Sequence, residues 1–218
     1  MGTIAVIDYG GSNLRSVAKA IEHVAAGRAE VLVSADPAVI AGAERVVFPG
    51  QGAIGACMTS LHALALDAAV SAAITSGRPF LGICLGLQSL LDASDEDGGT
   101  RGLGAVRGRV RRFTDGLTDP ATGARLKIPH MGWNQVHQAR AHPLWSGIAD
   151  HSRFYFVHSY YVVPEDPSVI AARTDYGIDF VSAIATGNVF ATQFHPEKSQ
   201  RAGLKLLENF IAWDGRAP

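Results

Sequence analysis

The sequence predicts an α/β fold with a mostly parallel central sheet, flanked by helices, and an added antiparallel region. In the first half of the chain, short apolar runs alternate with helical patterns, which is typical of βαβ units. In the second half, the apolar segments are short and separated by many turn residues, which favours antiparallel pairing. The chain has 218 residues without repeat, linker or low-complexity segment. We therefore expect residues 1–218 to form a single domain.

The first half should supply the parallel strands. We expect strands at residues 3–7, 30–33, 45–48 and 79–83. Ser12 or Asn13 can cap a helix that runs to about Ala26. The apolar face of this helix consists of Leu14, Val17, Ala18 and Ile21. The alanine-rich residues 63–75 predict another helix, which Gly77 ends.

The pattern changes after Leu91. Residues 92–99 are acidic and glycine-rich, which predicts a surface loop. Strands are expected at residues 106–113, 133–137, 154–163, 180–185 and 189–194. Thr186-Gly187-Asn188 between the last two predicts a hairpin. Ser199 should cap a final helix to about Trp213. Its inward-facing residues are expected to be Leu204, Leu207 and Ile211.

Composition excludes several functional classes. The net charge is −1, so no global field favours nucleic acid or a membrane surface. Cys57 and Cys84 cannot form a disulfide framework and suit a reducing compartment. No apolar run reaches membrane-spanning length, and the N-terminus lacks the basic region of a signal peptide. We expect a cytoplasmic protein that binds neither nucleic acid nor membrane.

Cys84 lies at a predicted strand-to-helix junction, with Gly82 and Gly86 two residues away on either side. This arrangement is typical of a nucleophile elbow, with cysteine in place of serine. The two glycines remove side chains that would collide at so sharp a turn. The positive end of the following helix dipole favours the reactive thiolate. Cys84 is therefore the candidate nucleophile.

A cysteine nucleophile needs a base, and the base needs an orienting group. His195 and Glu197 follow a predicted strand and are two residues apart, which places both side chains on one face of an extended chain. His195 can accept the proton of Cys84, while Glu197 accepts a hydrogen bond from the other ring nitrogen. Cysteine, histidine and glutamate in this order predict a catalytic triad.

Pro49-Gly50-Gln51-Gly52 follows the third strand and should lie beside the elbow, since open α/β sheets bind ligands at the carboxyl ends of their strands. Its glycines leave backbone N–H groups free to approach a ligand. This loop can supply one oxyanion donor, and the backbone N–H of Leu85 can supply another.

Two stretches, Gly82-Ile83-Cys84-Leu85-Gly86-Leu87-Gln88 and Phe194-His195-Pro196-Glu197, resemble the class I (triad) glutamine amidotransferases. Three more are similar to the branch of that family that serves histidine biosynthesis. They are Asp8-Tyr9-Gly10-Gly11-Ser12-Asn13-Leu14-Arg15-Ser16-Val17, Pro129-His130-Met131-Gly132-Trp133-Asn134 and Phe156-Val157-His158-Ser159-Tyr160. The resemblance runs from about residue 3 to about residue 212. It implies a flavodoxin-like amidotransferase fold.

The resemblance also implies the chemistry. Cys84 attacks the side-chain amide of L-glutamine and forms a glutamyl thioester, His195 transfers protons, and Glu197 holds His195. The residues implied to form the oxyanion strand and the substrate site are Gly50, Gln51, Gly52, Leu85, Gln88, His158, Ser159 and Tyr160. No cofactor and no metal are implied. Gln51 stands where the family often has an apolar residue, but the oxyanion donor is a backbone N–H.

The resemblance implies a partner as well. Ammonia passes directly to a (β/α)₈ cyclase in a heterodimer, and the cyclase forms imidazole glycerol phosphate and an aminoimidazole carboxamide ribotide. Asn13, Trp133 and Lys198 are the candidate interface residues.

Three other interpretations remain open at this stage. The chain could donate ammonia to another synthase, in a pyridoxal phosphate, anthranilate or amino-sugar pathway. It could be an inactive glutaminase with a regulatory or structural role, although its intact triad speaks against this. It could also be a stand-alone cysteine hydrolase or peptidase.

Overall fold

The computed structural model describes residues 2–11 and 13–216, and thirteen strands in this part of the chain form one sheet. Their order along the main path is β2-β1-β3-β4-β13-β12-β10-β7-β5-β6, while β11, β8 and β9 extend from β12. The strands are β1 Gly2–Ile7, β2 Ala29–Ser34, β3 Arg45–Gly50, β4 Phe80–Cys84, β5 Leu91–Ser94, β6 Thr100–Arg101, β7 Val106–Arg112, β8 His130–Gln138, β9 Ser152–His158, β10 Tyr160–Pro164, β11 Ile170–Asp175, β12 Asp179–Thr186 and β13 Val189–Thr192.

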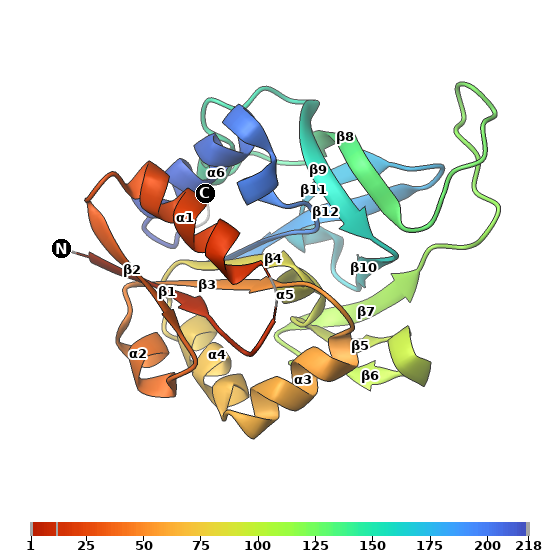
Figure 1. Ribbon diagram of the computed structural model, residues 1–218. Helices are drawn as coiled ribbons and strands as arrows, with labels where there is room; N and C mark the ends of the chain where they lie inside the picture. Colours follow the sequence, from red (N-terminus) through yellow and green to blue (C-terminus); the bar gives the residue numbers. More distant parts are fainter. Residues whose placement is uncertain (1, 12, 217–218) are drawn as a thin grey trace.

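The half of the sheet from β2 to β13 is parallel, as predicted. Helices cover both of its faces, with α1 and α6 on one side and α2, α3 and α4 on the other (Figure 1). The helices are α1 Leu14–Ala25, α2 Pro37–Gly42, α3 Ile54–Ala63, α4 Leu66–Thr75, α5 Leu85–Gln88 and α6 Gln200–Ala212. This layering leaves the carboxyl ends of β3 and β4 side by side, and they position the candidate site.

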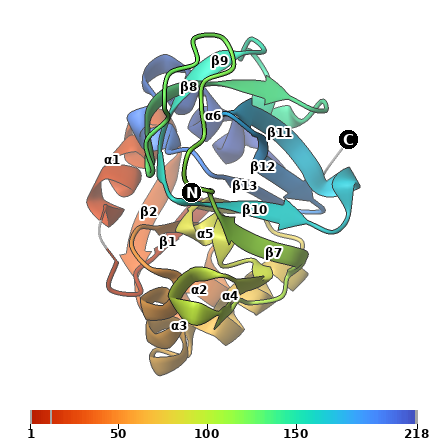
Figure 2. The same cartoon turned by 90° about the vertical axis from the view of Figure 1, so that its right-hand side faces the viewer.

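The antiparallel region is also as predicted. β13, β12, β10 and β7 pair antiparallel in turn, and β11, β8 and β9 form a second antiparallel group beside them (Figure 2). The hairpin at residues 186–188 joins β12 to β13. One expectation was wrong: residues 154–163 are not a single strand. Ser159 separates β9 from β10, and its carbonyl accepts a hydrogen bond from the Phe113 N–H at 3.0 Å.

The first and last helices differ in how well their faces were predicted. Leu14, Val17, Ala18 and Ile21 of α1 are all buried, as expected. In α6 the buried residues are Gly203, Leu206, Leu207 and Phe210, so the predicted inward positions Leu204 and Ile211 are only half-buried. The face of α6 is therefore rotated relative to the prediction. Ser199 occupies the N-cap position but makes no side-chain cap bond to the described helix.

The alternative caps for α1 have different outcomes. Ser12 lies outside the described residues. Asn13 occupies the N-cap position in a left-handed backbone conformation, with φ 74°, and its side chain makes no cap bond to α1 as described. The side chain bonds elsewhere, in the candidate site.

Two helices, α2 and α3, were not predicted from the sequence. Asp36 caps α2 through its side chain, which accepts a hydrogen bond from the Ala38 N–H at 2.8 Å, and Pro37 takes the first helical position. α3 is apolar around most of its circumference and gives little helical periodicity. Ala65 has a left-handed backbone conformation, with φ 53°, and separates α3 from α4. The helix expected from residue 63 therefore begins at Leu66.

The acidic segment at residues 92–99 is not a plain surface loop. Leu91 and Ser94 are fully buried, because β5 pairs in parallel with β7 and antiparallel with β6. The local acidity and glycine content predicted a loop, but pairing with distant strands decided the structure. The segment brings Glu96 to the candidate site.

Apolar side chains are buried against both faces of the sheet. The face under α3 and α4 carries mainly aliphatic residues. The face under α1 and α6 carries an aromatic cluster of Phe113, Phe154, Phe156, Phe180, Phe190 and Phe194. Within this cluster, the rings of Phe154 and Phe194 lie 4.2 Å apart, next to His195 in the sequence. His195, the predicted base, therefore follows a fully packed segment.

Among the described helices, none is by itself both long and apolar enough to cross a membrane. Taken together, α3 and α4 reach the length and composition of a span, but a 93° bend separates them.

Candidate active site

Cys84 ends β4 in a strained backbone conformation. Its φ of 54° and ψ of −102° are rare for a residue other than glycine, and α5 begins at the next residue. Such strain persists only where the surroundings enforce it and is common at nucleophile elbows. α5 is a single turn of four residues, so its dipole is weak.

The two elbow glycines are required by packing. A Cβ on Gly86 would lie 1.9 Å from the Phe48 carbonyl oxygen, and a Cβ on Gly82 would lie 2.9 Å from the Ala191 Cβ. Both distances are too short for a side chain. The elbow therefore presses directly against β3 and β13, which fixes the position of Cys84 in the sheet.

His195 and Glu197 are paired and buried. His195 Nδ1 lies 2.9 Å from Glu197 Oε1, and the two side chains are 1% and 0% exposed. The sequence predicted this pair from an extended segment, but β13 ends at Thr192 and a 3₁₀ turn, Pro196–Lys198, brings the carboxylate back to the ring. The pairing is as expected, whereas the local geometry that produces it is different.

The charges around His195 favour its protonated form. Burial lowers the pKa of the ring, but the nearby Cys84 thiolate and the Glu197 carboxylate outweigh burial and raise the pKa to about 10. Burial raises the pKa of Glu197, and the bond to His195 more than offsets this, so the net shift is downward. A side-chain hydrogen bond with Cys84 adds to the upward shift of the His195 pKa, and Nε2 is the ring nitrogen that the Glu197 bond leaves for it. The ring is thus arranged to carry a proton on the nitrogen that the pair with Glu197 leaves free.

Asn13 belongs to this group. Its Nδ2 donates a hydrogen bond to Glu197 Oε1 at 2.7 Å. The sequence analysis suggested Asn13 as a possible helix cap and as an interface candidate, but not as a partner of Glu197. The left-handed conformation at Asn13 turns its side chain toward Glu197, so the N-terminus of α1 helps to orient the carboxylate.

Two hydrogen-bonded glutamines lie near Cys84. Gln193 Nε2 lies 3.6 Å from Cys84 Sγ, and Gln193 Oε1 accepts a hydrogen bond from Gln88 Nε2 at 3.1 Å. Gln88 was predicted for the site, whereas Gln193 was missed. The signal was available: Gln193 precedes His195 by two residues, the spacing that places side chains on one face of an extended segment.

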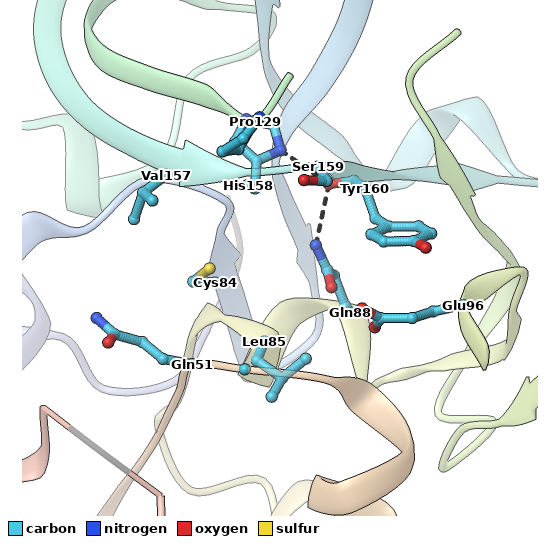
Figure 3. A pocket seen from close by; sticks show the side chains of 11 residues that line it. Gln51, Cys84, Leu85, Gln88, Glu96, Pro129, Val157, His158, Ser159 and Tyr160 are labelled. Carbon is cyan, nitrogen blue, oxygen red and sulfur yellow. Dashed lines mark hydrogen bonds between the residues drawn. The ribbon is translucent and has the colours of Figure 1, made fainter. Parts of the chain in front are cut away.

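A pocket of about 310 Å³ opens in front of Cys84. Its lining residues are Gln51, Gly52, Cys84, Leu85, Gln88, Glu96, Pro129, Val157, His158, Ser159 and Tyr160. Seven of the eight residues predicted for the oxyanion strand and substrate site therefore line one cavity with the nucleophile. Figure 3 shows Cys84 between Gln51 on one side and Gln88 and Glu96 on the other.

The eighth residue, Gly50, lies behind the pocket wall. It is the register partner of Cys84 in the β3–β4 pair. A Cβ on Gly50 would lie 2.6 Å from Tyr9 Oη and 2.8 Å from Leu85 Cβ. The absence of a side chain at Gly50 thus lets β3 lie directly against the elbow and brings the backbone of Gln51 to the pocket.

His158 lines the pocket, but both of its ring nitrogens bond within the protein. Nδ1 lies 2.8 Å from the Tyr160 carbonyl, and Nε2 lies 3.0 Å from His130 Nδ1. Burial lowers the pKa of His158 to about 3 and that of His130 to about 4, so both rings are neutral. The carbonyl can only accept, which makes His158 Nδ1 a donor and His130 Nδ1 the donor to His158 Nε2.

This series of hydrogen bonds continues beyond His130. Asn134 Nδ2 lies 3.3 Å from His130 Nε2, which must accept. At the other end, the Tyr160 carbonyl also accepts from Gln88 Nε2 at 3.0 Å. The residues from Pro129 to Asn134, singled out in the sequence, thus connect β8 to the wall of the pocket.

Glu96 was missed by the sequence analysis, which placed it in a surface loop. Burial raises the pKa of its carboxyl, while a hydrogen bond from the Ile54 N–H to Oε2, 3.0 Å long, lowers it, with a net upward shift. The carboxylate faces Gln88 across the pocket (Figure 3). No local pattern marks Glu96, because only the pairing of β5 with β7 brings it here.

The remaining interface candidates lie on one side of the triad. Trp133 is 39% exposed and packs edge-on against Tyr155, and Lys198 Nζ lies 5.9 Å from the centre of the Tyr155 ring. Met131, on the same strand as Trp133, is 62% exposed. Large apolar side chains exposed together are typical of a surface that a partner covers.

The family follows from comparison of the whole chain with known proteins. Residues 5–213 match the family model described as "Glutamine amidotransferase class-I". The chain belongs to this family. Two solved structures agree in fold: one is described as a GMP synthase component from Thermoplasma acidophilum and the other as a glutamine amidotransferase. Both have a TM-score of 0.68, at 20% and 18% identity. They cover 97% and 96% of this chain, and the chain covers 93% and 100% of theirs.

Curated relatives are much more similar in sequence. The imidazole glycerol phosphate synthase subunit HisH of Aromatoleum aromaticum is 57% identical over 98% of this chain and 99% of its own length. The HisH subunit of Dechloromonas aromatica is 58% identical over 97% of this chain and 96% of its own. Subunit HisH 1 of Pseudomonas aeruginosa is 56% identical over 99% of both. The amidotransferase family predicted from the sequence is thereby confirmed.

Proposed function

We propose that this chain is the glutaminase subunit of an imidazole glycerol phosphate synthase and acts in histidine biosynthesis. The single observation that carries this proposal is that Cys84, which lines the pocket, interacts with the buried His195–Glu197 pair, in a chain 56–58% identical to HisH subunits. We treat residues 1–218 as one amidotransferase domain.

In the proposed mechanism, the Cys84 thiolate attacks the carboxamide carbon of L-glutamine. The negative charge moves to the carboxamide oxygen, which the backbone N–H of Leu85 stabilises. The Gln51 backbone bonds to Tyr9 in this structure, so the Gln51 N–H would become a second donor only after this loop turns toward the substrate. His195 gives its Nε2 proton to the amide nitrogen, the C–N bond breaks, and ammonia leaves a glutamyl thioester on Cys84. Water then attacks the thioester, His195 accepts its proton, and glutamate and the thiolate are released. Glu197 keeps the ring oriented throughout.

The pocket suggests how glutamine is held. Glu96 carries a carboxylate opposite Gln88, and we propose that it pairs with the α-ammonium group of the substrate. The backbone near Ser159 and Tyr160, together with Gly52, would hold the α-carboxylate end. His158 supports this wall rather than binding substrate, because both of its ring nitrogens are engaged.

The ammonia should pass to a (β/α)₈ cyclase in a heterodimer. Free ammonia is mostly protonated at neutral pH, and ammonium is not a nucleophile, so a closed interface at the site is required. Trp133 and Lys198, with the exposed Met131, lie on the proposed interface, and Asn13 links that edge to Glu197. We also propose a cytoplasmic location, where the partner and nucleotide substrate would be found.

The test is an assay of glutamate release by the purified chain, alone and with the cyclase and its ribulosyl nucleotide substrate. We expect weak glutaminase activity alone and a large increase with both additions. Full activity without the partner would contradict the coupling to a synthase. An increase with the synthase partner of a different pathway, and none with the cyclase, would overturn the assignment to histidine biosynthesis.

A further inference from the structure

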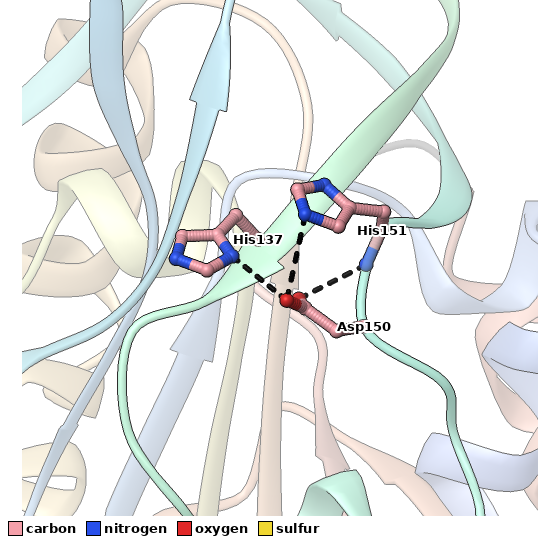
Figure 4. Close-up of side chains that lie close together, drawn as sticks. All are labelled: His137, Asp150 and His151. Atoms are coloured by element: carbon pink, nitrogen blue, oxygen red, sulfur yellow. Dashed lines mark hydrogen bonds and ion pairs between the residues drawn. The ribbon is translucent and has the colours of Figure 1, made fainter.

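Three metal-binding side chains meet at the far end of β8 from His130. His137 lies near the end of the strand, and Asp150 and His151 lie in the turn that leads into β9 (Figure 4). Within the described part of the chain, this is the one group of three or more such residues whose donor atoms all lie within 4.8 Å of one another. The sequence predicted no metal site, because the three positions form no recognised ligand motif.

The distances from Asp150 to the two histidine rings are compatible with a metal ion shared by the three side chains. Asp150 Oδ2 lies 2.9 Å from His137 Nδ1 and 3.5 Å from His151 Nε2. Zinc bonds to nitrogen or oxygen are about 2.0–2.2 Å long, which places neighbouring ligand atoms of a tetrahedral site about 3.3 Å apart. Two imidazoles and one carboxylate are a donor set that zinc accepts, whereas magnesium and calcium prefer oxygen ligands.

The group is held in place by the backbone. Asp150 Oδ1 accepts hydrogen bonds from the Gln138 N–H at 2.7 Å and the His151 N–H at 2.9 Å, which leaves Oδ2 directed at the two rings. His151 has a left-handed φ of 60°, a strained conformation that places its ring parallel to that of His137, 5.1 Å away. Outer bonds of this kind orient the ligands of metal sites.

A groove borders the group of three side chains. His137 and His151 line a polar groove of about 350 Å³ that also contains Asn134 and Arg173. The charge of Arg173 is offset by Asp179, 3.0 Å away. A water molecule or another small donor can therefore reach a metal at this position.

We propose that His137, Asp150 and His151 bind one divalent transition metal ion, zinc in particular, with a fourth position open to water. The ion would join the end of β8 to the turn before β9. It would stabilise the β8–β9 pair, whose opposite end supports the pocket through His130. The site is independent of the glutaminase proposal, since it shares no residue with the triad.

The experiment measures binding of Zn²⁺ and Co²⁺ to the full chain by competition with a chromophoric chelator. All proteins carry Cys84→Ala, so that the catalytic thiol cannot bind the metal. His137→Gln and His151→Gln each remove one ligand, and Asp150→Asn removes the charge but keeps the Oδ1 acceptor. His62→Gln is the matched control, because His62 Nδ1 pairs with Asp67 Oδ2 at 2.7 Å on the surface, with no third ligand among the described residues.

We expect one equivalent of metal per chain, visible Co²⁺ bands of a tetrahedral site, and a Zn²⁺-dependent rise in melting temperature. Each ligand variant should lose affinity about tenfold or more, while His62→Gln should bind as the parent does. Equal affinity of the parent and the ligand variants, or an equal loss in His62→Gln, would overturn the proposal. Half an equivalent per chain would also overturn it, since the metal would then bridge two copies.

Discussion

One carboxylate oxygen of Glu197 accepts the hydrogen bonds that orient the predicted His195–Glu197 pair. Oε1 accepts hydrogen bonds from both His195 Nδ1 and Asn13 Nδ2, while Oε2 is buried with no partner among the residues described. A buried carboxylate with so few donors depends strongly on each of them. The orientation of His195 therefore rests on a residue at the start of α1, far away in the sequence.

Replacing Asn13 by alanine should lower kcat for glutamine hydrolysis. The loss of a hydrogen bond to a charged group costs about 1.5–3 kcal/mol, which corresponds to roughly ten- to a hundredfold in rate if the whole cost falls on the reaction. Steady-state glutamate release measures it. The control is Asn209→Ala, which removes bonds to the Leu144 and Ser146 carbonyls remote from the site and should lower the melting temperature with little effect on kcat. If Asn13→Ala retained wild-type kcat, Asn13 would not orient Glu197.

The raised pKa of His195 predicts an alkaline limit to activity. The protonated ring donates to the leaving ammonia, so kcat should hold through neutral pH and fall as the pH rises through about 10. Glu197→Gln removes one charge that raises this pKa, so the alkaline fall in the rate of this variant should occur at lower pH. A pH series of single-turnover rates checks both. An unchanged alkaline fall in Glu197→Gln would show that the carboxylate does not sustain the imidazolium.

At the residue scale, the sequence predicted the side chains that have motif signatures. Cys84, His195, Glu197 and Gln88 come together as expected, and their catalytic and binding roles stay predictions. Glu96 was missed because only strand pairing brings it to the site, whereas Gln193 was missed although its spacing from His195 gave a local signal. Asn13 was singled out for another role, since a residue at a helix start gives no indication that its side chain turns outward to a carboxylate.

Among the elements, β3 and its loop are packed tightly against the strand-to-helix turn at Cys84. Gly50 lies against Tyr9 and Leu85, and Gly86 lies against the backbone of Phe48. Close contact between β3 and the elbow leaves no room for a side chain on either side. The positions of the proposed oxyanion donors are thus set by packing between two strands.

Gly50→Ala should displace the Pro49–Gly52 loop. The new Cβ would meet Tyr9 Oη at 2.6 Å and Leu85 Cβ at 2.8 Å, so the backbone must move. We expect a fall in kcat of roughly 100- to 1,000-fold, the usual effect of losing an oxyanion donor. Combining the change with Tyr9→Phe removes the hydroxyl contact and should recover part of the rate. Wild-type kcat in Gly50→Ala would mean that this loop does not determine the reaction rate.

At the element scale, periodicity predicted the parallel strands and the first helix well. Regions where tertiary pairing overrides local preference were predicted poorly. Residues 92–94 belong to β5 despite the acidity of the segment, with Glu96 in the turn that follows. In α3, the small residues Gly55, Ala56 and Ala63 outside the buried face weaken the helical pattern. The break at Ser159 splits a uniformly aromatic stretch that gives no local turn signal.

For the molecule as a whole, three buried neutral histidines link stability to pH. Burial lowers the pKa of His130 and His142 to about 4 and of His158 to about 3, from 6.5. Between these values the unfolded chain binds protons that the folded chain excludes, so stability is lost as the pH falls below about 6.5. The loss should level off only near pH 3–4, where the folded chain also takes up protons.

Denaturant unfolding from pH 7 to pH 4 measures this loss, which should be at least about 1 kcal/mol for each histidine. His142 is remote from the hydrogen-bonded pair of His130 and His158 at the pocket wall. His142→Gln should reduce the pH dependence of the free energy of unfolding and lower this free energy somewhat at pH 7. A free energy of unfolding that stays flat over this range in the wild type would contradict the neutral, buried state of the three rings.

The fold class and the family were predictable from the sequence, since both follow from patterns spread along the chain. The exposure of Met131 beside Trp133 and the cluster of His137, Asp150 and His151 were not predicted, because they depend on which residues the antiparallel region brings together. The central claim is that Cys84 releases the ammonia that a synthase partner consumes.

The most direct test compares Cys84→Ala with the wild type in complex with the (β/α)₈ cyclase, with either glutamine or an ammonium salt as nitrogen source. We predict that glutamine-dependent product formation falls roughly 1,000-fold or more, while ammonium-dependent formation is unchanged. Glutamine-dependent synthesis that survives in the Cys84→Ala complex would contradict the account.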